Sequence, residues 1–265
     1  MESILPAARA AQPAAPYIGG KRNLAKRLVE RIETIPHLTY AEPFVGMGGV
    51  FLRRRTPAKA EVINDLSGDV STFFRILQRH YAAFMEMLKF QITTRAEFER
   101  LVKVDPATLT DLERAARFLY LQRTAFGGKV EGRNFGISRH RPGRFDVTRL
   151  AVVLEDLHER LAGVTIERLP WADLIRRYDT GQTLFYLDPP YWGCEEDYGA
   201  ALFGRDQFEQ MAEVLATISG RFILSINDRP EVRTIFRRFQ LEAVGTTYTL
   251  AACTSAAAAE LIITN

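Results

Sequence analysis

The stretch from Asp188 to Trp192 combines the residue types needed to hold an amino group on a flat ring. It reads Asp-Pro-Pro-Tyr-Trp and directly follows an apolar run that ends at Leu187. Pro189 and Pro190 fix their own φ angles and favour extended conformations in the residues before them, so the carbonyls here are not absorbed into a helix or a β-ladder. The carboxylate and the free carbonyls could accept hydrogen bonds from an exocyclic amine while an aromatic side chain stacks on its ring. The alternative is a proline-rich turn with an incidental aspartate.

A second group of residues is typical of nucleoside binding. The segment 42–49 reads Glu-Pro-Phe-Val-Gly-Met-Gly-Gly, where a predicted strand gives way to a predicted helix. Glycines at such a turn let a ligand approach the backbone, and the helix N-terminus offers free N–H groups. Asp65 follows 19 residues after Gly46, at the end of a short predicted strand, where an acidic side chain can meet a ribose diol. Alone, Asp65 could equally be a solvated strand-end residue or a helix N-cap, and a phosphate-cradling turn is a less favoured interpretation of the glycines.

A third group lies near the start of the chain. Residues 17–21 read Tyr-Ile-Gly-Gly-Lys and precede a predicted helix whose apolar positions are Leu24, Leu28 and Ile32. Taken alone, this segment indicates a turn before a helix, with Lys21 as a solvated charge.

The elements that must position these groups alternate along the chain. Extended segments are predicted at 39–44, 61–64, 164–169, 183–187 and 222–226, followed by a β-rich end. Helices are predicted at 49–55 and 207–218, after Thr110, and from Leu150 to Leu161. Strands that alternate with helices predict an α/β fold with a mostly parallel, doubly wound sheet.

One interruption of this alternation suggests an inserted domain. We interpret residues 17–69 and 150–265 as one catalytic domain and residues 70–149, which are helix-rich and then rich in Gly and Arg, as an insertion. Residues 1–16, rich in Ala and Pro, are interpreted as a flexible tail.

Composition narrows the class of protein further. The chain has 265 residues, 47% of them hydrophobic, and no apolar run near the length of a membrane span. Two cysteines and four scattered histidines do not suggest a disulfide framework or a metal site. A cytoplasmic location, in a bacterium or a phage-infected host, is therefore expected, without membrane attachment.

The formal charge of +3 is concentrated rather than spread. The segment 114–149 holds nine basic and two acidic residues, a net charge of +7. A long Gly/Arg-rich loop without regular structure is costly to order unless it has a partner, and a polyanion is the simplest one. The alternative is a solvated basic loop. The candidates for DNA contact are Arg123, Lys129, Arg133, Asn134, Arg139 and Arg141.

The order of these motifs resembles a known family. Aromatic-x-Gly-Gly-Lys at 17–21, Glu-Pro-Phe-x-Gly-x-Gly at 42–48, Asn-Asp at 64–65 and Asp-Pro-Pro-Tyr at 188–191 follow the pattern of bacterial and phage DNA adenine methylases. The resemblance extends from Tyr17 to about the end of the chain and places the insertion where the α-type arrangement has its target-recognition domain. It implies a class I, Rossmann-like S-adenosylmethionine-dependent methyltransferase that modifies the N6 amine of adenine in double-stranded DNA. A monomer is expected, with a dimer on DNA as the alternative.

The same resemblance implies roles for individual residues. The cofactor would be S-adenosylmethionine, without a metal. Its implied binding residues are Tyr17, Gly19, Gly20, Lys21, Glu42, Phe44, Gly46, Gly48, Asp65 and Asp188. The implied catalytic residues are Asp188, Pro189, Pro190 and Tyr191. Lys21 would lie near the methionine carboxylate, Asp65 at the ribose and Asp188 where cofactor and target meet.

The implied chemistry is direct methyl transfer to a flipped base. The N6 lone pair of adenine is delocalised, so hydrogen bonds from its N–H groups to Asp188 and the Pro189 carbonyl would favour the pyramidal, nucleophilic amine. Methylation of cytosine C5 is disfavoured, because neither Cys194 nor Cys253 follows a proline. Methylation of cytosine N4 or of an RNA adenine, and a cofactor-binding DNA-recognition protein that has lost catalysis, remain as alternatives.

One segment departs from the family pattern. Ala251-Ala252 and the run 256–259 occupy a region where relatives usually carry Gly, Asn, Lys or Arg close to DNA. Alanine supplies no side-chain contact to phosphate, which weakens the case for DNA binding through this region.

Overall fold

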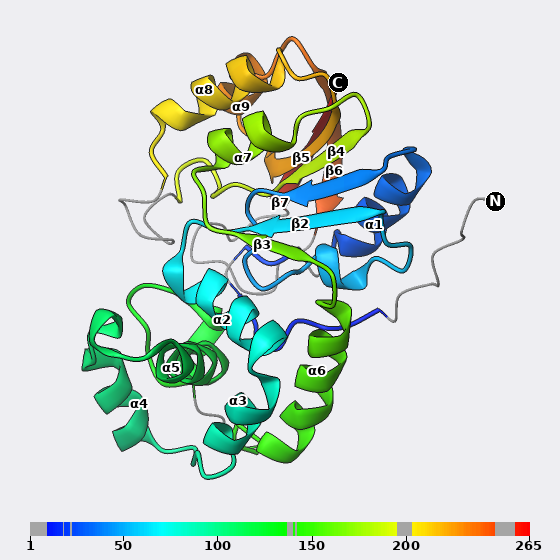
Figure 1. Cartoon of the computed structure of the whole chain (residues 1–265). Helices are drawn as coiled ribbons and strands as arrows, with labels where there is room; N and C mark the ends of the chain where they lie inside the picture. Colours follow the sequence, from blue (N-terminus) through cyan, green and yellow to red (C-terminus); the bar gives the residue numbers. More distant parts are fainter. Residues whose placement is uncertain are drawn as a thin grey trace, which may run out of the picture.

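A mostly parallel sheet forms the centre of the molecule. The computed structural model describes residues 10–17, 19–21, 23–136, 140, 142–194, 203–246 and 258–265. Within them, seven strands form one sheet in the order β3-β2-β1-β4-β5-β7-β6. The strands are β1 (Thr39–Glu42), β2 (Ala60–Asn64), β3 (Thr165–Glu167), β4 (Thr183–Leu187), β5 (Arg221–Asn227), β6 (Gln240–Thr246) and β7 (Ala258–Thr264). The first five are parallel, and β7 runs antiparallel to both β5 and β6, which confirms the predicted mostly parallel α/β sheet (Figure 1).

Both faces of the sheet are covered, which explains why its central strands are apolar throughout. Every residue of β4 is buried: Leu184 and Tyr186 belong to the core on one face, Phe185 and Leu187 to the core on the other. Helix α1 (Ala25–Thr34) packs on the first face. Helices α7 (Trp171–Tyr178), α8 (Asp206–Leu215) and α9 (Pro230–Ile235) cover the second face. A continuous apolar run is what a strand buried on both faces requires.

The strand order creates a crevice at one point of the sheet. The chain proceeds outward from β1 to β2 and β3, and then returns to β4 on the other side of β1. In doubly wound sheets, ligands bind outside the carboxyl ends of the strands where the order reverses. Here that edge lies after Glu42 and after Leu187, so the turns that follow β1 and β4 are brought together.

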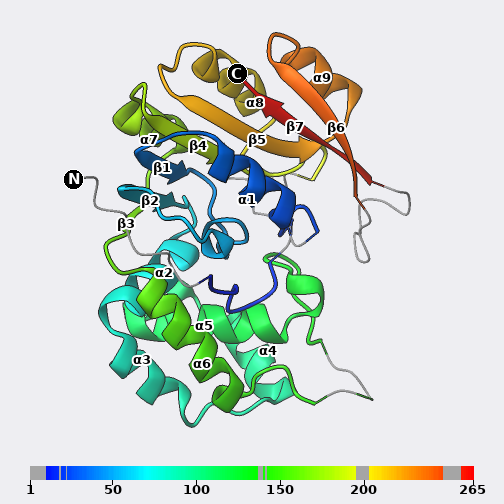
Figure 2. The same ribbon diagram turned by 90° about the vertical axis from the view of Figure 1, so that its right-hand side faces the viewer.

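The remaining helices form a second lobe on one side of the sheet (Figures 1 and 2). They are α2 (Gly68–Arg79), α3 (Tyr81–Leu88), α4 (Arg95–Lys103), α5 (Asp111–Thr124) and α6 (Val147–Arg160). Helix α5 is central and contacts α2, α3 and α4. It begins as predicted after Thr110, whose side chain and that of Glu113 form a capping box. The domain limits 70–149 stay a prediction, and the flanking helices α2 and α6 also pack in this lobe.

Two local predictions are wrong. The segment predicted as a helix at 49–55 contains only a short 3-10 turn, η1 (Phe51–Arg53), which ends at an extended Arg54. The basic segment predicted to lack structure is folded at 125–136, where Ala125 and Phe135 form an antiparallel bridge. The amide of Phe126 also donates to the carbonyl of Asn134. The predicted strands and the other predicted helices are found, with ends shifted by up to a few residues.

The N-terminal segment 10–16 is packed between the two lobes rather than loose (Figure 2). Ala11, Ala14 and Ala15 are buried, and the amide of Ala11 donates to the carbonyl of Leu52 at 2.8 Å. The interpretation of this part as a flexible tail is therefore wrong, because small alanine side chains fit where the two lobes meet. Residues 1–9 lie outside the described residues. In the part of the chain that is described, no helix has the length and apolar character needed to span a membrane.

Candidate active site

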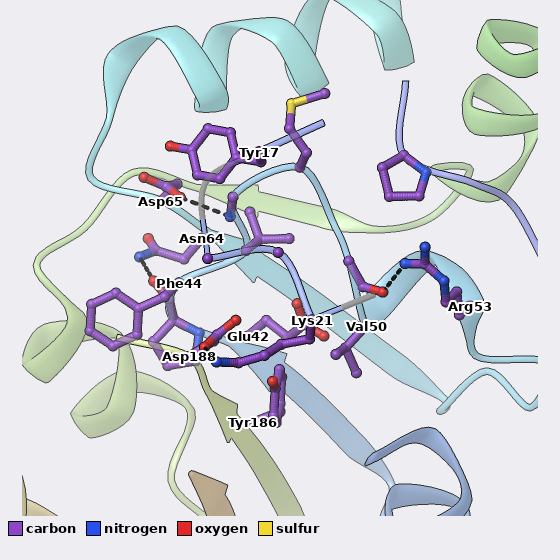
Figure 3. A pocket seen from close by; sticks show the side chains of 18 of the residues that line it. Tyr17, Lys21, Glu42, Phe44, Val50, Arg53, Asn64, Asp65, Tyr186 and Asp188 are labelled. Atoms are coloured by element: carbon purple, nitrogen blue, oxygen red, sulfur yellow. Dashed lines mark hydrogen bonds and ion pairs between the residues drawn. The ribbon is translucent and has the colours of Figure 1, made fainter. Parts of the chain in front are cut away.

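A cavity of about 1250 Å³ opens at the crevice beside β1 and β4 (Figure 3). All three sequence motifs and Asp65 contribute to its wall. The predicted site residues that line it are Tyr17, Gly19, Gly20, Lys21, Glu42, Phe44, Gly46, Asp65, Asp188 and Pro190, together with Arg123 from the predicted DNA-contacting set. Gly48, Pro189 and Tyr191 are not among the lining residues. The structure therefore brings together most of a site whose parts are up to about 170 residues apart in the chain.

The glycine turn after β1 has a backbone that other residues rarely adopt. Gly46 and Gly48 have φ angles of 49° and 74°. A Cβ atom on Gly46 would lie 3.1 Å from the ring of Tyr17, and one on Gly48 would lie 2.8 Å from the side chain of Leu52. Glycine at these two positions thus permits both the left-handed backbone conformation and the close approach of the neighbouring side chains.

Asp65 ties this turn to the end of β2. Its two carboxylate oxygens accept from the amides of Gly46 and Ser67, both at 2.9 Å. Burial raises the pKa of Asp65 to about 6, against the opposing effect of these two N–H donors. The side chain lines the cavity, and contact with a ribose stays a prediction for it.

Asn64, which precedes Asp65, joins three strand ends. Its amide nitrogen donates to the carbonyls of Pro43 and Leu169 at 2.9 and 3.0 Å, and its side-chain oxygen accepts from the Leu169 amide at 2.8 Å. Sequence reasoning assigned no role to Asn64, although the Asn-Asp pair at 64–65, at the end of a predicted strand, was a usable signal.

Glu42, the last residue of β1, is a buried carboxylate in the cavity wall. Only the hydroxyl of Tyr40 is seen to donate to it, at 2.6 Å, within the described residues. Burial raises the pKa of Glu42 to about 8, despite the hydrogen bond from Tyr40 and the charge of Arg54. A cation that enters the cavity would find a carboxyl group ready to release its proton.

Lys21 lies inside the site rather than in solvent. Its side chain is 1% exposed, and Nζ lies 2.9 Å from Asp188 Oδ1 and 3.4 Å from Glu260 Oε2. Nζ also donates to the hydroxyl of Tyr191 at 2.6 Å and lies 4.1 Å from the centre of its ring. Burial disfavours the ammonium, but the two carboxylates outweigh it and raise the pKa of Lys21. The interpretation as a solvated charge is wrong, and contact with a methionine carboxylate stays a prediction.

Asp188 faces the cavity from the end of β4 and retains 20% exposure. Burial raises its pKa to about 6, while the neighbouring Lys21 ammonium acts in the opposite direction. Ser225 on β5 donates to Oδ1 at 3.4 Å. Both of these contacts use the same oxygen, Oδ1.

The turn after Asp188 is held from the neighbouring strands. Asn227, at the end of β5, accepts from the amide of Trp192 at 2.9 Å and donates to its carbonyl at 3.0 Å. The hydroxyl of Tyr191 donates to Glu260 Oε1 at 2.6 Å. Sequence reasoning did not assign roles to Ser225, Asn227 or Glu260. Asn227 carried a signal, because it ends a parallel strand at the same edge, whereas the strand position of Glu260, on the antiparallel β7, does not indicate that it faces the site.

Aromatic side chains close one side of the site. Phe44 packs edge-on against Phe203, with ring centres 5.8 Å apart, and both line the cavity. Trp192 packs against Phe208 of α8 at 5.2 Å. A flat ring in the cavity would therefore meet aromatic surface.

The predicted DNA-contacting residues are only partly described. Arg123 is half-buried, and its guanidinium donates to the carbonyls of Arg144 and Ala14 at 2.9 and 2.6 Å. Arg133 is half-buried and donates to the Lys129 carbonyl at 3.2 Å. Of the other four candidates, Lys129 is half-buried and Asn134 is exposed. Arg139 and Arg141 lie outside the described residues. DNA contact stays a prediction for all six. The segment 247–257, which includes Cys253 and most of the Ala-rich region, also lies outside them.

Comparisons with known proteins agree with the site. The family model for D12 class N6 adenine-specific DNA methyltransferases matches residues 17–250. The chain is 21% identical over 231 residues to the type II methyltransferase M.CviBI of Paramecium bursaria Chlorella virus NC1A, covering 85% of this chain and 86% of that protein. It is 24% identical over 294 residues to the type II methyltransferase M1.LlaDCHI of Lactococcus lactis subsp. cremoris, covering 96% and 95%. It is 23% identical over 252 residues to the DNA N-6-adenine-methyltransferase of Escherichia phage P1, covering 88% of this chain and 32% of that longer protein.

Proposed function

The chain belongs to the D12 class of N6 adenine-specific DNA methyltransferases, and we propose that it transfers a methyl group from S-adenosylmethionine to an adenine flipped out of duplex DNA. The observation that carries this proposal is the position of Asp188. Asp188 directly follows β4 at the reversal of strand order and lines the same cavity as the glycine turn and Asp65. A donor and an acceptor of a methyl group can meet only where their two sites adjoin.

The residues present fit S-adenosylmethionine. The glycine turn leaves the backbone open to a ligand, because Gly46 carries no Cβ and its φ angle is positive. Glu42 supplies a buried carboxyl group and Asp65 a half-buried one on the wall, suited to an ammonium group and to a ribose diol. Phe44 supplies an aromatic surface. When bound there, the cofactor supplies an electrophilic methyl group on a sulfonium.

The residues after β4 would activate the amine of the target. Ionised Asp188 and the Pro189 carbonyl would accept the two N6–H groups, which favours the pyramidal amine and stabilises the positive charge that develops on nitrogen. Tyr191 would stack on the base. Since an adenine within a duplex cannot reach this cavity, the base must be flipped, at a cost of a few kcal/mol.

The helical lobe would then provide the DNA-facing surface. We propose that residues 70–149 act as the target-recognition domain, because the loop 125–136 follows α5 directly and Val130 in it lines the cavity. Lys129 and Arg133 belong to this loop, so phosphate or base contacts there would lie beside the flipped nucleotide.

A single labelling experiment tests the proposal. The protein is incubated with methyl-labelled S-adenosylmethionine and mixed-sequence duplex DNA, and the DNA is digested to nucleosides. Label in N6-methyladenine is the expected result. Label in N4-methylcytosine, label only when RNA replaces DNA, or tight DNA binding with no label would each overturn it.

A further inference from the structure

Glu260 is a fully buried carboxylate that is not among the predicted site residues. It lies on β7 and is 0% exposed. Its Oε1 accepts the hydroxyl of Tyr191 at 2.6 Å, while Oε2 lies 3.4 Å from Lys21 Nζ and has no hydrogen bond within the described residues. A buried carboxylate with one oxygen left without a hydrogen bond is costly, so a function is expected to retain it.

The register of the sheet places Glu260 next to another residue that holds the same turn. Glu260 lies directly opposite Asn227 in the antiparallel pair of β7 and β5. Asn227 binds both backbone groups of Trp192, and Glu260 binds the side chain of Tyr191. One cross-strand pair thus fixes two consecutive residues after the two prolines. The tyrosine ring is held at its hydroxyl end, which sets the direction of its face.

Glu260 is also a second ion-pair partner of Lys21, beside Asp188. The ammonium lies 2.9 Å from Asp188 and 3.4 Å from Glu260, so two carboxylates share one cation. Without Glu260, Lys21 would be free to pair with Asp188 alone and would compete with an incoming amine for that carboxylate. With Glu260 present, the described contacts of Asp188 remain on Oδ1.

We propose that Glu260 is a positioning residue for methyl transfer: it orients Tyr191 against the target base and draws Lys21 partly away from Asp188. This inference rests on the proposed function, because both effects act on a bound adenine. Glu260 acts through Tyr191 and Lys21 and is not among the residues that line the cavity.

The test compares single-turnover methyl transfer by the wild type, Glu260→Gln, Glu260→Ala, Tyr191→Phe and the double variant Tyr191→Phe/Glu260→Ala. Glu260→Ala and Tyr191→Phe should each slow transfer on the order of tenfold, and the double variant should be no slower than Glu260→Ala, because the shared contact is lost only once. Glu260→Gln should be intermediate, since its oxygen still accepts the tyrosine hydroxyl but no longer attracts Lys21. The affinity for S-adenosylmethionine should stay within about twofold of the wild type in all variants.

A second measurement distinguishes orientation from general damage. Duplex DNA with 2-aminopurine at the target position reports stacking of the flipped base by its fluorescence, and Glu260→Ala and Tyr191→Phe should raise that fluorescence alike. Glu242→Gln is the matched control, because Glu242 is a carboxylate on the adjacent strand β6 that pairs with Arg27 and Arg31 outside the site. It should match the wild type in both measurements.

The outcomes separate two failures. If the wild type places no label on adenine, the proposed function fails and this inference falls with it. If the wild type is active and both Glu260 variants transfer within about twofold of it, or if the double variant shows the product of the two single effects, only the positioning role is overturned. Should Glu260→Ala not fold, the transfer rate of Glu260→Gln and the fluorescence of Tyr191→Phe decide the question. A slower rate together with raised fluorescence supports the inference, and a rate within about twofold of the wild type or wild-type fluorescence overturns it.

Discussion

Asp188 is the residue on which the chemistry most directly depends. Its replacement by alanine removes the acceptor that would hold the N6 amine and the negative charge that would stabilise the developing cation. We expect Asp188→Ala to lower the single-turnover rate by at least about 10²-fold, the usual effect of losing one preorganised electrostatic group. Asp173→Ala removes an exposed carboxylate from an i,i+3 pair on α7 and should leave the rate unchanged. Substantial turnover by Asp188→Ala would remove this residue from its assigned role.

The ionisation of Asp188 gives a second prediction. Burial raises its pKa to about 6, so the carboxylate in the free enzyme loses its charge as the pH falls through that value. Since kcat/KM reports the free enzyme, it should rise with pH between about 5 and 7 and then level off. Asp65 also has a pKa of about 6, so Asp65→Asn is the control and should keep the same pH profile at a lower rate. If Asp65→Asn lost this pH dependence, the titrating group would be Asp65, and the prediction for Asp188 would be contradicted.

Glu42 gives a prediction about stability. Its pKa in the folded protein is about 8, above the ordinary value of 4.5. An acid whose folded pKa is raised contributes stability that is complete below its unfolded pKa and is lost as the pH rises through the folded one. The free energy of unfolding of the wild type should therefore fall relative to that of Glu42→Gln between about pH 5 and 8.5, by a few kcal/mol at most. Urea unfolding of the ligand-free proteins at both pH values measures this, and parallel curves would contradict it.

At the scale of elements, the last turn of α5 connects the helical lobe to the cofactor side of the cavity. The buried amide of Gln122 donates to the carbonyls of Pro16 and Gly128 at 3.0 and 2.5 Å. Pro16 precedes Tyr17, whose ring packs on Gly46. One side chain thus holds the segment that carries the first motif.

We expect Gln122→Ala to destabilise the protein by about 1–3 kcal/mol, because a buried carbonyl loses its donor. It should also weaken binding of S-adenosylmethionine, since Tyr17 is no longer held over the glycine turn. Chemical unfolding and calorimetric titration measure the two effects. Gln182→Ala, at an exposed position before β4, is the control for both. Unchanged cofactor affinity in Gln122→Ala would show that the α5 contact does not reach the site.

The sequence was informative where local chemistry decides the structure. Strand β4 has the predicted limits because an apolar run is ended by Asp-Pro-Pro, and the glycine turn was predictable because a positive φ favours glycine. Glu260 was not predictable in the same way, because its role depends on the register between β5 and β7. The burial of residues 10–16 also depends on a tertiary contact, since Ala and Pro carry no pattern that indicates packing. The turns at strand ends could thus be predicted from the sequence, whereas the contacts that cross the sheet or join the lobes could not.

At the scale of the whole molecule, fewer of the positive charges in 114–149 are available to a polyanion than their number suggests. Seven of the nine basic residues lie in the described part of the chain, and six of these side chains contact carboxylates or backbone carbonyls of the protein. They are Arg114, Arg117, Arg123, Arg133, Arg144 and Arg149. A sequence shows the charges but not these partners, so the total of +7 overstates what a polyanion would meet.

This difference predicts how DNA binding depends on salt. Lys129 remains as a candidate, together with Arg139 and Arg141, which lie outside the described residues. Each phosphate contact contributes about −0.9 to the slope of log K against log salt concentration. If DNA meets these three residues, we expect a slope near −3, whereas nine contacts would give about −8. Lys129→Ala should make the slope less negative by about 0.9, while Arg114→Gln should not change it, because that guanidinium is bound to Asp69 at 2.6 Å. Fluorescence anisotropy with a duplex at several salt concentrations measures the slopes, and a value near −8 would mean that DNA draws the paired arginines away from their internal partners.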